Sequence, residues 1–345
     1  MFLPVRQAKC YIGSQSVSCN LTGVCLYRAE KQEQRKRYKM QNTIATSVSI
    51  TGTGLHSGKP VRLRLRPAGV DTGLIFRRTD LDAAVQDIAV SPAAWVEASL
   101  CTVLQNAHGV RVSTIEHLLA ALHGCGVHNV IVELDAEEVP ILDGSAAPFV
   151  RKLLRAGVKA LDAPLKALRV LKPVSVEKDG ARASLRPARQ LELAFEIDFA
   201  EPAIGRQSRN LAMCNGAFLR ELSDCRTFCQ RRDVERMQAA GLALGGTLDN
   251  AVVFHEGEIL SPGGLRHADE PVRHKMLDAM GDLYVAGLPI LARYEGVRAG
   301  HALTGRLLQA LFATPDAYEI VTLDGSARKR LPGSGISLSD LPLSA

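Results

Sequence analysis

Apolar and polar residues along the chain follow two different periods, and each period predicts a different kind of element. In residues 61–66, valine and leucine alternate with arginine, which is typical of a β-strand with one buried and one solvent-facing side. Three apolar segments also predict strands: residues 129–134, 168–176 and 191–199. Four segments carry apolar residues at helical spacing: residues 115–125, 146–156, 271–286 and 301–312. Because helices and strands occur in both halves of the chain, we predict an α+β fold.

The two halves meet at residues 160–166, which we predict to be a linker because strands and helices lie on both sides of it. A chain of 345 residues also has the length of about two ordinary domains. We therefore predict a first α+β domain over residues 40–163 and a second over residues 164–345.

The first 39 residues differ from the rest in pattern and in charge. They show neither period, and they hold eight basic residues against two acidic ones, which accounts for the whole formal net charge of +6. The remaining chain is balanced in charge, so composition does not favour a nucleic-acid-binding protein. We predict residues 1–39 to be a disordered extension, explained best by an upstream start codon or an added tail. Two alternatives stay open: an organelle transit peptide, and a basic arm that makes transient contact with a membrane surface or nucleic acid.

Composition excludes two other classes of protein. Apolar residues make up 46% of the chain, enough for a sizeable core, yet no run reaches the roughly 18 uninterrupted apolar residues of a membrane span. The eight cysteines are too sparse for a disulfide-stapled miniprotein. We therefore expect reduced thiols and a cytoplasmic location.

A first candidate for chemistry is the pair Glu116-His117, at the start of the helix expected over residues 115–125. Ser113 or Thr114 suits the N-cap of that helix, and a carboxylate in the first turn stabilises the helix dipole without any further role. The functional alternative is a metal-ligating histidine beside a carboxylate that acts as a base.

A second candidate is the series His274, Asp278 and Asp282, which lies at i, i+4 and i+8 on the helix expected over residues 271–286. Such a stripe can be a solvated helix face. Alternatively, His274 and Asp278 supply two metal ligands from successive turns, Asp282 orients another group, and Lys275 holds an anionic part of a substrate.

A third candidate is His301, which follows Gly300 at the start of another expected helix. A single histidine there is commonly a hydrogen-bonded structural residue. Because histidine titrates near neutral pH, the functional alternative is a general acid or an oxyanion stabiliser. Taken together, the three candidates supply the parts of a metal-dependent hydrolase of an amide or ester.

Ordered along the chain, these segments resemble the UDP-3-O-acyl-N-acetylglucosamine deacetylase family. The resemblance extends from about Met40 almost to the C-terminus. It is carried by seven stretches: Gly52-Thr53-Gly54-Leu55-His56-Ser57-Gly58, Phe76-Arg77-Arg78-Thr79-Asp80-Leu81, Ser113-Thr114-Ile115-Glu116-His117-Leu118, Ile141-Leu142-Asp143-Gly144-Ser145-Ala146-Ala147-Pro148-Phe149, Arg226-Thr227-Phe228, Arg273-His274-Lys275-Met276-Leu277-Asp278-Ala279-Met280-Gly281-Asp282 and Gly300-His301-Ala302-Leu303.

The resemblance implies two α+β domains of layered sheets and helices with the active site between them. It implies zinc as the cofactor and a hydrolytic reaction that removes acetate from the acylated UDP-sugar, the committed step of lipid A biosynthesis. The implied zinc ligands are His117, His274 and Asp278.

The implied catalytic residues surround that ion. Glu116 would be the general base, and His301, oriented by Asp282, would be the cationic partner of the leaving amine and the oxyanion. Thr227 would donate a hydrogen bond to the oxyanion, and Lys275 would face the anionic nucleotide side. Whether His301 or Glu116 protonates the amine stays open.

The implied substrate contacts are spread over both domains. Arg298 would lie on the nucleotide side, and Asp198 and Phe199 would border the uridine end. An insert near residues 229–270 would form an apolar passage for the acyl chain, whose preferred length stays open. Further substrate-binding residues are expected at three positions: Leu55, Cys101 and Phe228.

Two functions of other kinds stay open beside this one. The chain could be a non-catalytic binding protein that keeps the fold, although pure binding does not require Glu116. It could also be a zinc amidohydrolase that uses the same residues on a different acylated substrate.

Overall fold

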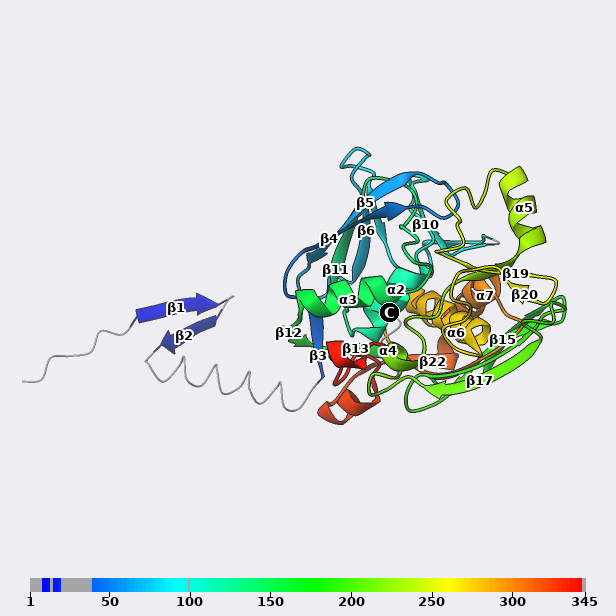
Figure 1. Ribbon diagram of the computed structural model, residues 1–345. Coiled ribbons are helices and arrows are strands. Elements are labelled where there is room, and N and C mark those ends of the chain that lie inside the picture. The colour runs from blue at the N-terminus through cyan, green and yellow to red at the C-terminus, as the bar shows by residue number, and fades with distance from the viewer. Residues whose placement is uncertain (1–7, 13–14, 20–38, 99, 343–345) are drawn as a thin grey trace, which may run out of the picture.

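The structure is a computed structural model that describes residues 8–12, 15–19, 39–98 and 100–342 (Figure 1). Its first sheet has the strand order β4-β5-β11-β6-β7, in which β11 pairs parallel with β6 and antiparallel with β5. The strands of this sheet are β4 (Val48–Thr53), β5 (Pro60–Pro67), β6 (Leu74–Arg78), β7 (Asp87–Ala89) and β11 (Val130–Leu134). The alternation in residues 61–66 is confirmed, because Val61, Leu63 and Leu65 are buried while the arginines between them are exposed.

The second sheet is larger and is centred on β21, which pairs antiparallel with β15 and parallel with β13 and β16. Its strands are β13 (Lys166–Val170), β14 (Val174–Lys178), β15 (Ala181–Pro187), β16 (Glu192–Asp198), β17 (Arg206–Ala212), β21 (Ile290–Val297) and β22 (Tyr318–Thr322). The single strand expected over residues 168–176 is two strands, because the segment breaks before Pro173, which has no N–H for a sheet hydrogen bond.

Helices fill the space between the two sheets, as Figure 1 shows. Helix α3 packs against β4 and α2, α2 packs against α6, and α6 and α7 pack against the second sheet. The bounds are α2 (Glu116–Gly124), α3 (Ala147–Ala156), α6 (Glu270–Leu283) and α7 (His301–Phe312). The four predicted helices are therefore confirmed, and the α+β class with them. Every residue of α2 is buried, including its polar ones, and α3 and α6 both pack against it.

Short elements complete the described chain. Strands β8 (Trp95–Val96), β9 (Val103–Gln105) and β10 (Arg111–Ser113) form a small sheet ahead of α2. Helix α4 (Ala217–Glu221) lies between β17 and β18 in the sequence. A second small sheet contains β18 (Phe228–Gln230), β19 (Val252–His255) and β20 (Glu258–Ile259), with α5 (Arg231–Ala239) between β18 and β19 in the sequence. Four 3₁₀ turns follow helices or end the chain: η1 (Tyr284–Ala286), η2 (Pro315–Ala317), η3 (Gly325–Arg330) and η4 (Leu338–Asp340).

The expected linker at residues 160–166 is not an irregular connection. Strand β12 (Val158–Pro164) pairs antiparallel with β3 (Met40–Ile44), β13 begins at Lys166, and Leu165 between them is buried. One apolar cluster also includes residues from both sheets, among them Phe76 and Leu193. The division into residues 40–163 and 164–345 therefore stays a prediction.

The N-terminal extension contains two described strands that the sequence pattern did not predict. Strands β1 (Ala8–Ile12) and β2 (Gln15–Cys19) pair antiparallel with each other. The prediction of disorder for the rest of residues 1–38 lies outside the described residues. In the described part of the chain, no helix is both long and apolar enough to cross a membrane.

Helices α2 and α6 approach each other most closely at Gly281. A Cβ atom at this position would lie 2.0 Å from the backbone oxygen of Glu116. Only a residue without a side chain permits this contact, and the contact brings the residues that follow Glu116 next to those on α6. Glycine at position 281 therefore determines how close the two helices lie.

Replacing Gly281 by alanine is expected to lower the free energy of unfolding by about 3 kcal/mol, the upper part of the range for overpacking a core. The backbone of α2 cannot move away without disturbing the packing around it, since all of α2 is buried. Urea unfolding followed by circular dichroism measures the effect. Gly69→Ala is the control, because a Cβ there would meet only the Thr72 hydroxyl at 3.8 Å. Equal stability of the two variants would contradict the close approach.

A buried histidine on α2 makes stability depend on pH. His123 is 3% exposed and stacks on Tyr284, with ring centroids 4.3 Å apart. Burial lowers the pKa of His123 to about 4. In the unfolded chain a histidine titrates near 6.5, so between about pH 6.5 and pH 4 the unfolded state binds a proton that the folded state does not. The stabilisation is therefore present above pH 6.5 and is lost as the pH falls to about 4.

His123→Phe keeps an aromatic ring on Tyr284 and removes the titrating group. Wild type is expected to lose roughly 3 kcal/mol more of its free energy of unfolding between pH 6.5 and pH 4 than this variant does. Denaturant unfolding at several pH values measures the difference. Parallel pH curves for the two proteins would show that His123 does not take part.

Candidate active site

A cavity of ≈ 990 Å³ lies beside the middle of α6 and the start of α7. Its inner wall includes His274, Asp278 and His301, which are polar, whereas much of the remaining wall is apolar. Such a combination of an apolar pocket with a few converging polar groups is typical of ligand-binding sites. Candidate residues from two separate segments of sequence, those on α6 and at the start of α7, therefore meet at one cavity.

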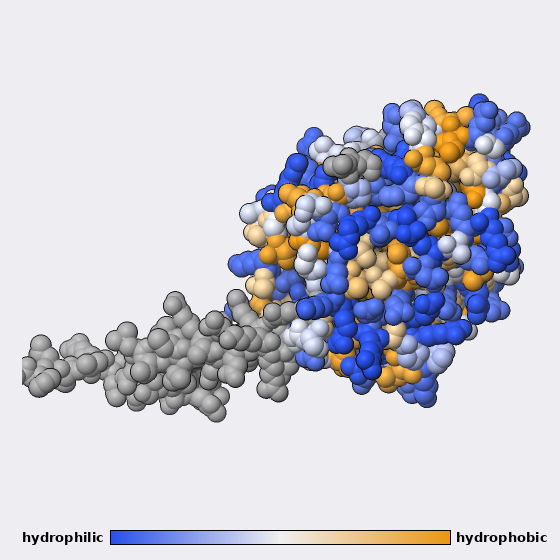
Figure 2. Space-filling view, turned by 60° about the horizontal axis from the view of Figure 1, so that its bottom comes forward, coloured by the Kyte–Doolittle hydropathy of each residue, from blue (hydrophilic) through white to orange (hydrophobic). Residues whose placement is uncertain are grey.

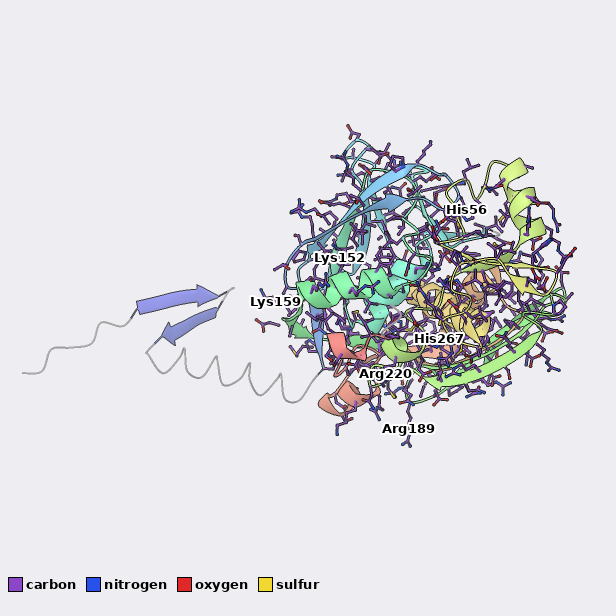
Figure 3. The ribbon with its side chains drawn as sticks, in the orientation of Figure 1. His56, Lys152, Lys159, Arg189, Arg220 and His267 are labelled. Atoms are coloured by element: carbon purple, nitrogen blue, oxygen red, sulfur yellow. The ribbon has the colours of Figure 1, made fainter. Side chains whose placement is uncertain are left out.

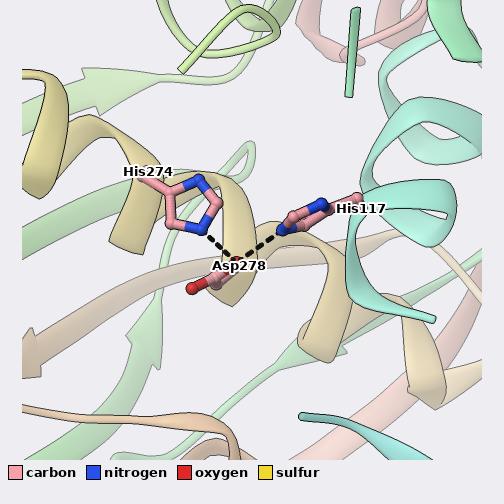
Figure 4. Close-up of side chains that lie close together, drawn as sticks. All are labelled: His117, His274 and Asp278. Atoms are coloured by element: carbon pink, nitrogen blue, oxygen red, sulfur yellow. Dashed lines mark ion pairs between the residues drawn. The ribbon is translucent and has the colours of Figure 1, made fainter. Parts of the chain in front are cut away.

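Three ligand-type side chains converge at the inner end (Figure 4). Asp278 Oδ1 lies 3.2 Å from His274 Nε2 and 3.5 Å from His117 Nε2. His274 and Asp278 come from successive turns of α6, and His117 comes from the first turn of α2. Each of the three side chains is at most 6% exposed. The helical spacing of His274 and Asp278 is therefore confirmed, and the alternative of a solvated face is wrong.

The chemistry of these atoms fits a divalent metal ion. Asp278 Oδ1 is buried and has no hydrogen-bond partner among the described residues, while two imidazole nitrogens face it. His274 donates its Nδ1–H to the Cys225 carbonyl at 3.0 Å, which leaves Nε2 with a lone pair directed at the group. Burial lowers the pKa of His274 to about 3, so its imidazole is neutral. Two imidazole nitrogens and one carboxylate oxygen form a three-ligand set of the kind that catalytic metal sites use.

The outer oxygen of Asp278 is bonded to Lys275. Lys275 Nζ donates to Asp278 Oδ2 at 2.7 Å, so the carboxylate offers only Oδ1 to the other two ligands. Burial alone would raise the pKa of Asp278, but the positive charges of Lys275 and His301 are among the neighbours that outweigh burial and hold that pKa well below its usual value. Lys275 also lines the cavity. Its role toward an anionic part of the substrate stays a prediction.

Glu116 and His301 lie close to each other and His301 lies close to Asp278. His301 Nε2 lies 3.9 Å from Glu116 Oε1 and 3.8 Å from Asp278 Oδ2. The other ring nitrogen, Nδ1, lies 3.0 and 3.1 Å from the two oxygens of Asp282. This contact fixes the ring so that Nε2 is the atom directed at the cavity. Asp282, one turn after Asp278, orients the histidine as expected from the stripe on α6.

The pKa values of Glu116 and His301 are both raised, which suits Glu116 to accept a proton and His301 to carry one. Burial raises the pKa of Glu116, which makes its carboxylate a stronger proton acceptor. Burial alone would lower the pKa of His301, but Asp282 and Glu116 outweigh it and raise the pKa to about 9. At neutral pH His301 is therefore an imidazolium beside Glu116.

The start of α2 differs from the expected N-cap. The cap residue is Ile115, and no side chain caps the helix. Thr114 is in the left-handed region with φ 56°, and its hydroxyl donates to Glu138 Oε1 at 3.0 Å. Glu138 also accepts the backbone N–H groups of His56 and Ser57. The prediction of Ser113 or Thr114 as N-cap is wrong because Glu138 engages that hydroxyl. The turn of residues 54–58 is thereby tied to the start of α2.

Several expected contact residues line the cavity. Thr227 lines the cavity. Its backbone N–H donates to the carbonyl oxygen of Gly144, and its own carbonyl oxygen accepts from the backbone N–H of Val252, each at 2.8 Å. The Phe228 ring lies edge-on to Phe199 and to His274, at centroid distances of 5.4 and 6.2 Å. Leu55 lines the wall formed by the turn that precedes β5, and Figure 3 shows the neighbouring His56 on the side of the molecule that faces α5.

Three other expected contact residues lie outside the cavity wall. Asp198 is exposed at the end of β16, opposite Arg206 of β17. Arg298 is exposed, and its Nη2 donates to Gly180 O at 2.6 Å. Cys101 is 8% exposed, and burial, the main cause, raises its thiol pKa to about 12. Their contacts with substrate stay predictions.

The segment expected as an insert supplies much of the apolar wall. Ala243, Leu248, Ala251 and Val253 line the cavity together with residues of α5. Leucines at 242, 244 and 248 are 38–55% exposed, and α5 has no buried residue. Figure 2 shows apolar residues gathered at the upper right of the face drawn, within a surface that is otherwise largely polar. An apolar wall of this kind can take up a hydrocarbon chain.

Three supporting residues were not predicted from the sequence. Glu138 connects the turn at residues 54–58 to α2, the Cys225 carbonyl orients His274, and Thr102 contacts Glu116 and Asp282. Neither a backbone carbonyl nor a loop threonine has a pattern that sets it apart in one sequence.

Cys225 and Cys229 are four residues apart, a spacing typical of neighbours on a helix. The structure has no helix there, because Cys225 is in a loop and Cys229 is in β18.

This chain is similar to a family of known enzymes. Residues 41–313 match the LpxC family, described as UDP-3-O-acyl N-acetylglycosamine deacetylase. A UDP-3-O-acyl-N-acetylglucosamine deacetylase from Phenylobacterium zucineum (strain HLK1) is 51% identical over 282 residues, which cover 82% of this chain and 96% of that protein. Proteins of the same name from Shewanella sp. (strain W3-18-1) and Shewanella oneidensis are 47% and 46% identical over 289 residues, covering 83% of this chain and 94% of each relative. The chain therefore belongs to the UDP-3-O-acyl-N-acetylglucosamine deacetylase family.

Proposed function

We propose that this protein hydrolyses the acetamide of UDP-3-O-acyl-N-acetylglucosamine, releasing acetate and the free amine, as a step of lipid A biosynthesis. The observation that carries the proposal is the convergence of His117, His274 and Asp278 with Glu116 and His301 at one end of a cavity whose remaining wall is largely apolar. An amide hydrolase needs the polar end, and an acylated substrate needs the apolar wall. Membership of the family supports the same substrate.

The cofactor in this proposal is one zinc ion held by His117, His274 and Asp278. Two imidazole nitrogens and one carboxylate oxygen are common ligands of catalytic zinc, and the buried Oδ1 of Asp278 is oriented for such a role. When bound there, zinc supplies Lewis-acid chemistry, because its charge acidifies water and polarises an amide oxygen.

Glu116 is the general base in this mechanism. Its carboxylate is buried next to His117 and is not among the three ligands, so its oxygens can take a proton from the attacking water. The backbone N–H of Thr102 donates to Oε2 at 3.0 Å, which leaves Oε1 as the oxygen directed toward His301 and the cavity. The proton that leaves water is thereby held at one defined atom.

His301 is the cationic partner in the same step. Asp282 holds its Nδ1, so the Nε2–H of the imidazolium points at the place where negative charge develops on the amide oxygen. Thr227, which also lines the cavity, supplies a hydroxyl for the same oxygen. The sugar amine then receives its proton from His301 or from Glu116, since both side chains face the reacting centre.

The rest of the substrate extends from this centre in the proposal. The apolar wall of residues 243–253 and Phe228 takes the acyl chain, and Lys275 lies at the edge of the polar end, where it can meet an anionic group. Contacts of Asp198, Phe199, Arg298, Leu55 and Cys101 with the substrate belong to the proposal, as does the placement of the site between two domains. A cytoplasmic location suits the free thiols of the cysteines at 101, 125, 214, 225 and 229. Transient contact with a membrane surface is also part of the proposal.

The experiment is an assay of the purified full chain with the acylated UDP-sugar. Equal amounts of acetate and free amine are expected, measured separately by enzymatic acetate detection and mass spectrometry. The same sugar nucleotide without the acyl chain serves as the comparison and is expected to react far more slowly, because it cannot use the apolar wall. Acetate release from neither compound would contradict the proposed function.

A further inference from the structure

Thr102 contacts Glu116, Asp282 and His301, the side chains proposed to accept, orient and donate protons. It directly precedes β9, and it is 1% exposed. Its backbone N–H donates to Glu116 Oε2 at 3.0 Å, and its hydroxyl donates to Asp282 Oδ1 at 2.5 Å. The same hydroxyl oxygen lies 3.4 Å from His301 Nδ1. One loop residue thus contacts side chains from α2, α6 and α7.

The direction of these hydrogen bonds limits what each partner can do. An ionised carboxylate only accepts, so the Thr102 hydroxyl must be the donor to Asp282. With Oδ1 held by Thr102, the carboxylate of Asp282 is fixed in the orientation in which both oxygens face His301 Nδ1. Without the hydroxyl, rotation of the carboxylate would let the imidazole turn and move Nε2 away from the reacting centre.

The backbone contact has a matching effect on the base. Glu116 Oε2 accepts from Thr102, while Oε1 lies 3.9 Å from His301 Nε2. The two oxygens of Glu116 are therefore not equivalent, and the one turned toward the cavity is determined by the position of the Thr102 backbone. Because the hydroxyl ties that backbone to α6, the base and the imidazole share a single anchor.

We propose that Thr102 is a positioning residue of the deacetylation reaction, which holds Glu116 directly and His301 through Asp282 so that both face one point of the cavity. The inference rests on the proposed function. It differs from a packing role, because packing requires only the size and shape of the side chain, whereas positioning requires the hydroxyl.

Thr102→Val tests this distinction, since valine keeps the shape and the backbone N–H but removes the donor. We expect kcat to fall about 10- to 100-fold, the range that corresponds to the loss of a hydrogen bond to a charged group, with KM nearly unchanged. Thr102→Ser keeps a hydroxyl and is expected to recover most of kcat. The matched control is Thr43→Val, which removes another buried threonine hydroxyl, one that accepts from Ala68 N at 2.9 Å. That control is expected to lower the melting temperature and leave kcat within about twofold.

A double-mutant cycle separates positioning from a general loss of structure. If Thr102 acts through His301, Thr102→Val in a His301→Gln background should reduce kcat much less than it does in the wild type. Equal reductions in both backgrounds, or a serine variant as slow as the valine variant, would overturn the proposal. Should the valine variant fail to fold, Thr102→Ala and Thr102→Ser are compared in its place. A wild type that releases no acetate would instead refute the proposed function, so the two failures are distinguishable.

Discussion

Replacing Glu116 by glutamine is expected to reduce kcat by roughly 10²–10⁴-fold, the range for removal of a general base. Glutamine has nearly the same shape, and its carbonyl oxygen can still accept the N–H of Thr102, but it cannot take a proton from water. Because Glu116 is not one of the three converging ligand residues, metal content should stay at the wild-type level.

Steady-state kinetics and metal analysis on the same preparation measure both parts of this prediction. The matched control is Glu201→Gln, since Glu201 is also buried and accepts a backbone N–H, that of Gly257 at 2.7 Å, outside the cavity wall. Turnover within tenfold of wild type would leave Glu116 a first-turn helix residue. A loss of metal in Glu116→Gln would instead make it a ligand.

Replacing His117, His274 or Asp278 by alanine is expected to lower metal content and activity together, each activity by about 100-fold or more. Removing even an outer partner of a metal ligand typically lowers affinity or activity 10–100-fold, and here one of three ligands is lost. His123→Phe is the control on the same helix as His117, because it removes a buried histidine that does not face the cavity. Full metal occupancy in all three alanine variants would refute the ligand assignment.

Much of the fold could be predicted because its signals are local. The arginine alternation of β5 and the helical spacing of α6 need only the neighbouring residues in the sequence, and both were confirmed. The same spacing predicts that His274, Asp278 and Asp282 share one face of α6. It does not predict that the face is buried, since burial depends on α2 and α7 packing against it.

The unpredicted parts depend on contacts between distant segments. Residues 160–166 were expected to be a linker because strands and helices lie on both sides, but residues 160–164 are part of β12, since β3, more than a hundred residues earlier, is available for pairing. Thr114 does not cap α2, because its hydroxyl donates instead to Glu138, which lies 24 residues away in the sequence. Thr102 is 180 residues from its partner Asp282. A single sequence carries the residue types of such contacts but not their pairing.

Metal removal and restoration test the central claim most directly. The full chain is stripped with a chelator, refilled stepwise with zinc, and followed by acetate release from the acylated UDP-sugar and by circular dichroism. We predict that activity disappears without loss of the fold and returns in proportion to zinc, reaching its maximum at one ion per chain. An apoprotein that keeps full activity, or zinc that binds His117→Ala as tightly as it binds the wild type, would contradict a zinc-dependent site built from His117, His274 and Asp278.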